Sequence, residues 1–160
     1  MKYYVGFDPG LDGAFAVLTA AGDIVQVFDM PTVEVLSGTS LKRKIAPAVI
    51  ASELRIFTEE DIFGIVEQVS AMPGQGVTSM FNFGKSVGLL EGMLAGMGIP
   101  FTTVTPAQWK RKMGANASKD GARELAMRQW PAHADTFKRK KDDGRAEACL
   151  LALYQIKYGV

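Results

Sequence analysis

Four acidic residues of this 160-residue chain lie at the expected ends of strands or in the first turns of an expected helix. Asp8 follows a short apolar run near the N-terminus, and Glu67 follows a second such run. Asp143 and Glu147 are four residues apart, so a helix there would place both on one face. Clustered carboxylates repel one another unless a cation compensates them, and hard divalent ions prefer such oxygen ligands. The pattern therefore favours a metal site, and a pair of ions held in this way suits in-line phosphoryl displacement.

Each of these acids also has a plainer interpretation when it is taken alone. Aspartate is a common turn residue, so Asp8 can simply initiate the turn that follows it. Acids in the first turns of a helix interact favourably with the helix dipole, which would account for Asp143 and Glu147 without a metal. We favour the metal site because three separate elements end or begin with acids.

Five apolar or β-branched runs predict strands: Tyr3–Phe7, Ala14–Leu18, Ile24–Met30, Ile62–Val66 and Ile99–Val104. The first three, joined by turn formers, predict an antiparallel meander with Asp8 at the tip of its first hairpin. If the strand before Glu67 is a parallel neighbour of the first, the two acids lie side by side. We therefore expect an α/β fold with a mixed five-stranded sheet, a meander followed by parallel strands, flanked by helices.

Apolar residues at helical spacing predict five helices: Lys42–Glu59, Val77–Gly98, Ala107–Lys112, Lys119–Trp130 and Asp142–Tyr158. Thr105 and Ser118 are the expected N-caps of the third and fourth helices. The segment Thr32–Leu41 is expected to be irregular, and 37–40 is expected to be its most mobile part.

The helix expected over 77–98 carries glycine at every fourth position: Gly84, Gly88, Gly92 and Gly96. Each glycine costs a helix about 1 kcal/mol relative to alanine. Close approach of another backbone would offset this cost. The approaching element is either the sheet of the same chain, which we favour slightly, or the same helix of a second copy.

Composition indicates one globular domain spanning 1–160, with 48% hydrophobic and 22% charged residues. A single cysteine excludes an internal disulfide and indicates a reducing compartment. The N-terminal apolar run is too short for a signal peptide, and no stretch of bilayer length is free of charges. We expect a soluble, cytoplasmic protein without a membrane partner.

Charge is unevenly distributed although the formal net charge is only +1. Between Trp109 and Lys141 there are ten basic and three acidic residues, which gives this segment a net charge of +7. Such segregation is expected of a surface that binds a polyanion, although basic residues also commonly serve to solvate helices.

Four stretches from end to end of the chain carry a resemblance to a known family: GFDPGLDGAFAVL at the start, IVEQV around Glu67, TPAQWKRKMGANASK from Thr105 and DDGRAEACLLA from Asp142. In this order and spacing they resemble RuvC-type Holliday junction resolvases of the RNase H-like superfamily, in particular their compact bacteriophage-type relatives. The resemblance implies an RNase H-like nuclease domain with Mg²⁺ or Mn²⁺ as cofactor and two ions per active site. It also implies a homodimer, for which helix 77–98 is the candidate interface, and the host cytoplasm if a phage encodes the protein.

The resemblance also assigns residues. It implies that Asp8, Glu67, Asp143 and Glu147 are the metal ligands and that Lys119 is the basic catalytic residue. The expected DNA contacts are basic residues of the segment described above: Lys110, Arg111, Lys112, Lys119, Arg123, Lys138, Arg139 and Lys140.

Two departures from the bacterial pattern affect these assignments. Bacterial RuvC has two aspartates three residues apart on its last helix, so Asp142 is an alternative or an aid to Asp143 here. The bacterial enzymes also carry an aromatic wedge just after the strand-end glutamate, where this chain has Ser70 and Met72. Phe81 or Phe83 is the expected substitute.

We therefore expect a metal-dependent endonuclease that resolves four-way DNA junctions by paired symmetric cuts. The alternatives are a related nuclease acting on other branched DNA, flaps or RNA–DNA hybrids, and a junction-binding protein without catalysis. The Asp-Pro-Gly turn is also similar to the phosphate loop of actin-like ATPases and sugar kinases. Those proteins need two such domains, so we expect no nucleotide cofactor here.

Overall fold

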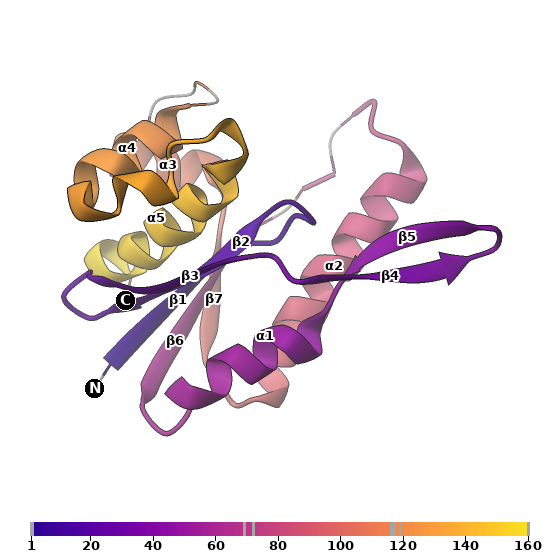
Figure 1. Ribbon diagram of the computed structural model, residues 1–160, viewed down its shortest axis with the longest axis horizontal. Helices are drawn as coiled ribbons and strands as arrows, with labels where there is room; N and C mark the ends of the chain where they lie inside the picture. The colour runs from indigo at the N-terminus through magenta and orange to yellow at the C-terminus, as the bar shows by residue number, and fades with distance from the viewer. Residues whose placement is uncertain (1, 69, 72, 116–117, 119, 160) are drawn as a thin grey trace.

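The computed structural model describes residues 2–68, 70–71, 73–115, 118 and 120–159. It contains a five-stranded sheet with helices on both faces (Figure 1). The strands are β1 (Lys2–Asp8), β2 (Ala14–Thr19), β3 (Ile24–Asp29), β6 (Asp61–Glu67) and β7 (Phe101–Val104), in the order β3-β2-β1-β6-β7. Strands β1, β2 and β3 pair antiparallel, whereas β1, β6 and β7 pair parallel. The expected mixed sheet is therefore confirmed.

The helices form two layers, one on each face of the sheet (Figure 1). Helices α1 (Pro47–Leu54) and α2 (Val77–Gly96) cover one face. Helices α3 (Pro106–Met113), α4 (Gly121–Gln129) and α5 (Asp143–Tyr158) cover the other. Short 3₁₀ turns occupy Arg55–Phe57, Pro131–Thr136 and Lys140–Asp142. None of the described helices is long and apolar enough to span a membrane.

Strand β1 lies at the centre of the sheet and contributes to the core on both faces. Val5 and Phe7 point into the α1/α2 layer, whereas Gly6 faces α5. A Cβ atom on Gly6 would lie 2.1 Å from the carbonyl oxygen of Ala148. The absence of a side chain at Gly6 thus lets α5 lie directly against β1, which brings the start of α5 close to the end of the strand.

The segment after β3 differs from the expectation of an irregular, mobile loop. Strands β4 (Thr32–Ser37) and β5 (Ser40–Ile45) form a separate antiparallel hairpin, which projects from the sheet beside α2 (Figure 1). Its two-residue turn has Gly38 at a φ of 62°, a conformation that glycine adopts readily and that matches the twist of a hairpin. The turn residues that indicate a loop are therefore the tip of a hairpin.

Two expected helix starts are wrong for local reasons. The first helix begins at Pro47 and not at Lys42, since Pro47 is well suited to the first helical position and restricts the preceding residue to extended backbone. Helix α4 begins at Gly121, after the expected cap Ser118, and Asp120 stands at its N-cap position. The expectation for Thr105 is correct, because its side chain accepts a hydrogen bond from the Gln108 amide.

The glycine row of α2 contradicts the favoured intramolecular explanation. A Cβ atom added at Gly84, Gly88, Gly92 or Gly96 would meet nothing within 4 Å. No described part of this chain therefore approaches that face of the helix closely.

Candidate active site

Asp8 and Glu67 end two neighbouring parallel strands, β1 and β6. The register pairs Phe7 with Val66, and both of these side chains lie in the α1/α2 layer. Because successive side chains alternate between the faces of a sheet, the next residue of each strand points to the α5 side. The local strand period and the parallel pairing thus bring two carboxylates from distant parts of the sequence to one side of one edge.

Helix α5 adds a third carboxylate at this edge. Carboxylate oxygens of Asp8, Glu67 and Glu147 all lie within 4.8 Å of one another. The start of α5 is held close to the β1–β2 turn, since a Cβ atom on Gly144 would lie 2.9 Å from the Cα atom of Gly13. Two glycines that permit close approach therefore position Glu147 opposite the strand ends.

The electrostatics of this cluster show that it needs a compensating charge. Burial raises the pKa of Asp8 to about 8, with further contributions from the negative charges of Glu147 and Glu67. Burial also raises the pKa of Glu67, and Glu147 adds to the effect. Full ionisation of the three carboxylates is therefore unfavourable at neutral pH, and a proton or a cation relieves their repulsion. The donors of the cluster are all carboxylate oxygens, which are the ligands preferred by Mg²⁺ and Mn²⁺.

Helix α3 places two neighbouring side chains against these carboxylates. The indole nitrogen of Trp109 donates a hydrogen bond of 2.7 Å to Oε2 of Glu67, and Trp109 is fully buried. Its hydrogen bond opposes the rise in the pKa of Glu67. Sequence reasoning did not assign Trp109 a role, although the residue lies within one of the stretches that carry the resemblance.

Lys110 forms an ion pair of 2.6 Å between its Nζ and Oε1 of Glu147. Burial alone would lower the pKa of Lys110, but the hydrogen bond and charge of Glu147, together with Glu67 and Asp8, raise it above its ordinary value. Lys110 therefore stays protonated and supplies part of the positive charge that the cluster requires.

The structure distinguishes the two aspartates at the start of α5. Asp142 is buried and accepts hydrogen bonds from the backbone and guanidinium of Arg139, while Arg145 lies 3.8 Å from its Oδ1. Burial would raise the pKa of Asp142, but the hydrogen bonds and charge of Arg139, with Arg145, hold it below its usual range. Asp143 is exposed, and its charge is among those that raise the pKa of Asp8. Asp143 is thus the aspartate electrostatically linked to the cluster, although it is not one of the three acids that converge there.

The expected DNA contacts fall into several structural situations. Lys119 lies outside the described residues. Arg123 is buried and donates hydrogen bonds to the carbonyl oxygens of Phe137 and Lys138, so it braces α4 internally and is not exposed for a ligand. The other expected contacts have at least part of their surface accessible: Lys110, Arg111, Lys112, Lys138, Arg139 and Lys140.

This sheet order, with carboxylates from β1, β6 and α5 at one edge, is the mixed α/β arrangement that the resemblance implies. Comparison with solved structures agrees. RuvC from Thermus thermophilus, solved in complex with a Holliday junction substrate, matches 99% of this chain and 94% of its own with a TM-score of 0.65 and 16% sequence identity. A second structure of RuvC from that organism matches 98% of this chain and 96% of its own, with a TM-score of 0.56 and 14% identity.

Comparison with curated proteins gives a sequence relationship as well. The chloroplastic Holliday junction resolvase MOC1 of Chlamydomonas reinhardtii is 30% identical over 97 residues, which are 59% of this chain and 11% of that protein. The chain thus spans about a tenth of the length of this relative. No protein-family model matches the chain. Together the sequence and structural similarities confirm the resemblance to RuvC-type resolvases that the four sequence stretches indicate.

Proposed function

We propose that this protein is a divalent-cation-dependent endonuclease that resolves four-way DNA junctions by paired symmetric cuts. The observation that carries the proposal is the convergence of three carboxylates from three elements at the sheet edge of a RuvC-like fold. The proposal is supported by the similarity of the chain to a Holliday junction resolvase and to a RuvC solved in complex with a Holliday junction substrate. We also propose that the whole chain acts as one nuclease domain in a reducing, cytoplasmic setting.

Asp8, Glu67 and Glu147 would hold the cation, and Asp143 would join them as a fourth ligand when a second ion is present. Bound Mg²⁺ or Mn²⁺ supplies charge compensation and activation of water for in-line attack on a phosphodiester. Asp142 is not part of this set, because Arg139 and Arg145 already occupy its carboxylate.

The residues around the carboxylates orient them. Trp109 fixes the rotamer of Glu67 through its hydrogen bond, and Lys110 holds Glu147 in the metal-free protein. With a cation bound at the cluster, the Nζ atom of Lys110 would be available to contact a phosphate of the substrate. Lys119 is the proposed basic residue at the scissile phosphate, where it would stabilise developing negative charge.

The test is cleavage of a synthetic four-way junction in Mg²⁺ and in Mn²⁺, with linear duplex, a flap and an RNA–DNA hybrid as competing substrates. Wild type is expected to make paired symmetric nicks on the junction only. Glu67→Gln is expected to bind the junction without cutting it. Glu59→Gln, an equal change at an exposed site remote from the cluster, serves as the control and is expected to cut normally. Binding without nicks by wild type would indicate a non-catalytic binder, and cutting of flaps or hybrids instead would change the substrate.

Paired cuts require two active sites, so we propose a homodimer with α2 in its interface. Support comes from the glycine row of α2, which is open on the surface of the chain, and from the adjoining shallow groove that Met80, Val87 and Glu91 help to line. A symmetric contact through this face would let the two helices approach closely and would offset the helix cost of the glycines. Light scattering is expected to give twice the chain mass, and a monomer in the presence of junction DNA would refute this interface.

We propose Phe81 as the residue that opens the junction. It lies near the start of α2 and is 71% exposed, whereas Phe83 is half-buried. Met72, one of the two residues at the position of the bacterial wedge, lies outside the described residues, and Ser70 has no aromatic ring to stack on a base. Phe81→Ala is expected to slow junction cleavage while leaving cation binding unchanged.

A further inference from the structure

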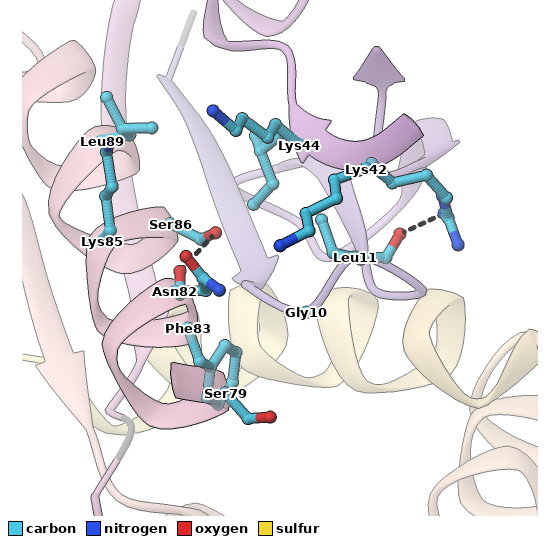
Figure 2. A pocket seen from close by; sticks show the side chains of 12 residues that line it. Gly10, Leu11, Lys42, Lys44, Ser79, Asn82, Phe83, Lys85, Ser86 and Leu89 are labelled. Atoms are coloured by element: carbon cyan, nitrogen blue, oxygen red, sulfur yellow. Dashed lines mark hydrogen bonds between the residues drawn. The ribbon is translucent and has the colours of Figure 1, made fainter. Parts of the chain in front are cut away.

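A groove lies between the β4–β5 hairpin and helix α2, on the face of the sheet opposite α5 (Figure 2). Strand β5 contributes Lys42 and Lys44, and α2 contributes Asn82 and Ser86. The β1–β2 turn contributes Gly10, which is two residues from Asp8. The groove therefore reaches the turn that follows the acidic cluster.

The register of the hairpin explains why two lysines share the groove. Lys44 pairs with Val33 and Lys42 pairs with Val35, so all four side chains lie on one face of the two-stranded ribbon. Two residues along a strand span about 7 Å, which makes the lysines a short row of cations. Figure 2 shows both lysines on the strand that faces α2 across the groove.

The hairpin is attached to the active-site turn and is not a loose arm. The guanidinium of Arg43 donates hydrogen bonds of 2.8 Å to Oδ1 of Asp12 and 2.9 Å to the carbonyl oxygen of Leu11 (Figure 2 shows the latter). Ile45 at the end of β5 is 3% exposed and belongs to the core beneath α1 and α2. The lysine row is therefore held in place relative to Asp8.

The charged side chains among the described residues that line the groove are all basic. Lys42, Lys44 and Lys85 are exposed, and none of them forms an ion pair with another residue in the described part of the chain. No acidic side chain is among the described residues that line the groove. Such a surface is complementary to a polyanion, and its open form suits an extended chain.

We propose that this groove binds the sugar-phosphate backbone of one duplex arm of the junction, a proposal that rests on the proposed nuclease function. Lys42, Lys44 and Lys85 would contact successive phosphates, and Asn82 would donate a hydrogen bond to a phosphate oxygen. The basic residues of α3 lie on the other face of the sheet. The DNA would thus be held on both sides of the edge that carries the acidic cluster.

The first experiment measures junction affinity against salt concentration in the Glu67→Gln background, which keeps the substrate intact. The groove variant is Lys42→Ala/Lys44→Ala/Lys85→Ala. The control is Lys2→Ala/Arg55→Ala/Lys157→Ala, which removes the same charge from exposed positions remote from the groove. Loss of three phosphate contacts is expected to weaken binding roughly 10- to 100-fold near 0.1 M salt and to reduce the slope of log K against log salt by about two to three. The control is expected to change affinity less than about threefold.

The second experiment does not depend on the triple variant. Cys149 is the sole cysteine and is fully buried, so Lys42→Cys can be labelled selectively with a photo-crosslinker. Crosslinks are expected on the backbone of one arm, beside the cut strand. Crosslinks to a second protein copy, or none to DNA, would overturn the proposal.

The outcomes separate this proposal from the proposed function. If wild type binds and cuts junctions while the groove variant keeps its affinity and salt slope, the groove proposal alone fails. If wild type neither binds nor cuts any branched DNA, the nuclease function itself fails. Equal weakening by the groove variant and the control would also refute the groove, because the effect would then reflect net charge only.

Discussion

Changing a residue of an active site usually affects stability little or lowers it, but for the acidic cluster we expect the opposite. Asp8→Asn should stabilise the metal-free protein at neutral pH. Burial and the charges of Glu147 and Glu67 raise the pKa of Asp8 from its ordinary value of 3.8 to about 8. Between these two pH values the folded chain keeps a proton at Asp8 that the unfolded chain has released. The free energy of unfolding therefore falls as the pH rises through this window.

The size of the effect follows from the shift. At pH 7 the raised pKa of Asp8 corresponds to a loss of about 4 kcal/mol in the free energy of unfolding, relative to a carboxyl group with an unperturbed pKa. The accessible surface of Asp8 shows that the residue is only half-buried, so solvent screening reduces this free-energy difference. We expect Asp8→Asn, which has the same shape and no charge, to raise the free energy of unfolding by about 1–3 kcal/mol at pH 7.

The assay is urea unfolding in EDTA at a series of pH values from 4 to 8, with Asp23→Asn as a control at an exposed turn. The gain from Asp8→Asn should be largest near neutral pH and should shrink as the pH falls toward the ordinary pKa of 3.8, below which Asp8 is protonated in both the folded and the unfolded chain. Saturating Mg²⁺ should offset most or all of the gain, because a cation held a hundredfold above its dissociation constant stabilises the wild-type fold by about 2.7 kcal/mol. A gain that is absent, or that does not depend on pH, would refute the electrostatic reasoning.

Three further changes test how the structure supports the site. Gly6→Ala places a carbon 2.1 Å from a carbonyl oxygen of α5 and should lower the free energy of unfolding by about 3 kcal/mol or more. Gly92→Ala, on the open face of α2, should instead raise the free energy of unfolding of the isolated chain by up to about 1 kcal/mol. Urea unfolding compares the two variants, and equal effects would contradict the packing argument. Trp109→Phe loses a hydrogen bond to a carboxylate, whereas Trp130→Phe loses one to a backbone carbonyl. The first change should lower the free energy of unfolding by about 1 kcal/mol more than the second in the same assay. Trp109→Phe should also weaken cation binding measured by calorimetry. The hydrogen bond and charge of Arg145 lower the pKa of Asp29, so Asp29→Asn should lower the free energy of unfolding by about 0.5–1 kcal/mol above pH 5. This loss should disappear as the pH falls through the lowered pKa of Asp29. A loss of stability that persists in acid would exclude the ion pair as its cause.

Most of the sheet could be predicted from the sequence because its signals are local. Runs of strand-forming residues and the turn formers between them identify β1, β2, β3, β6 and β7. The hairpin β4–β5 was missed because the same glycine and serine residues occur in loops and in two-residue turns. Only pairing of the flanking residues distinguishes the two, and pairing is a tertiary property.

The candidate site shows the same division. The positions of acids at the ends of two strands and at the start of the last helix follow from residue order alone, because element ends are local features. The folded chain was needed to show that Arg139 pairs with Asp142, that Trp109 donates a hydrogen bond to Glu67, and that a lysine row faces α2 across a groove. These outcomes depend on distances between segments far apart in the chain. Neither residue type nor spacing specifies such a distance, because parallel pairing, helix packing and close approach at glycines together set it.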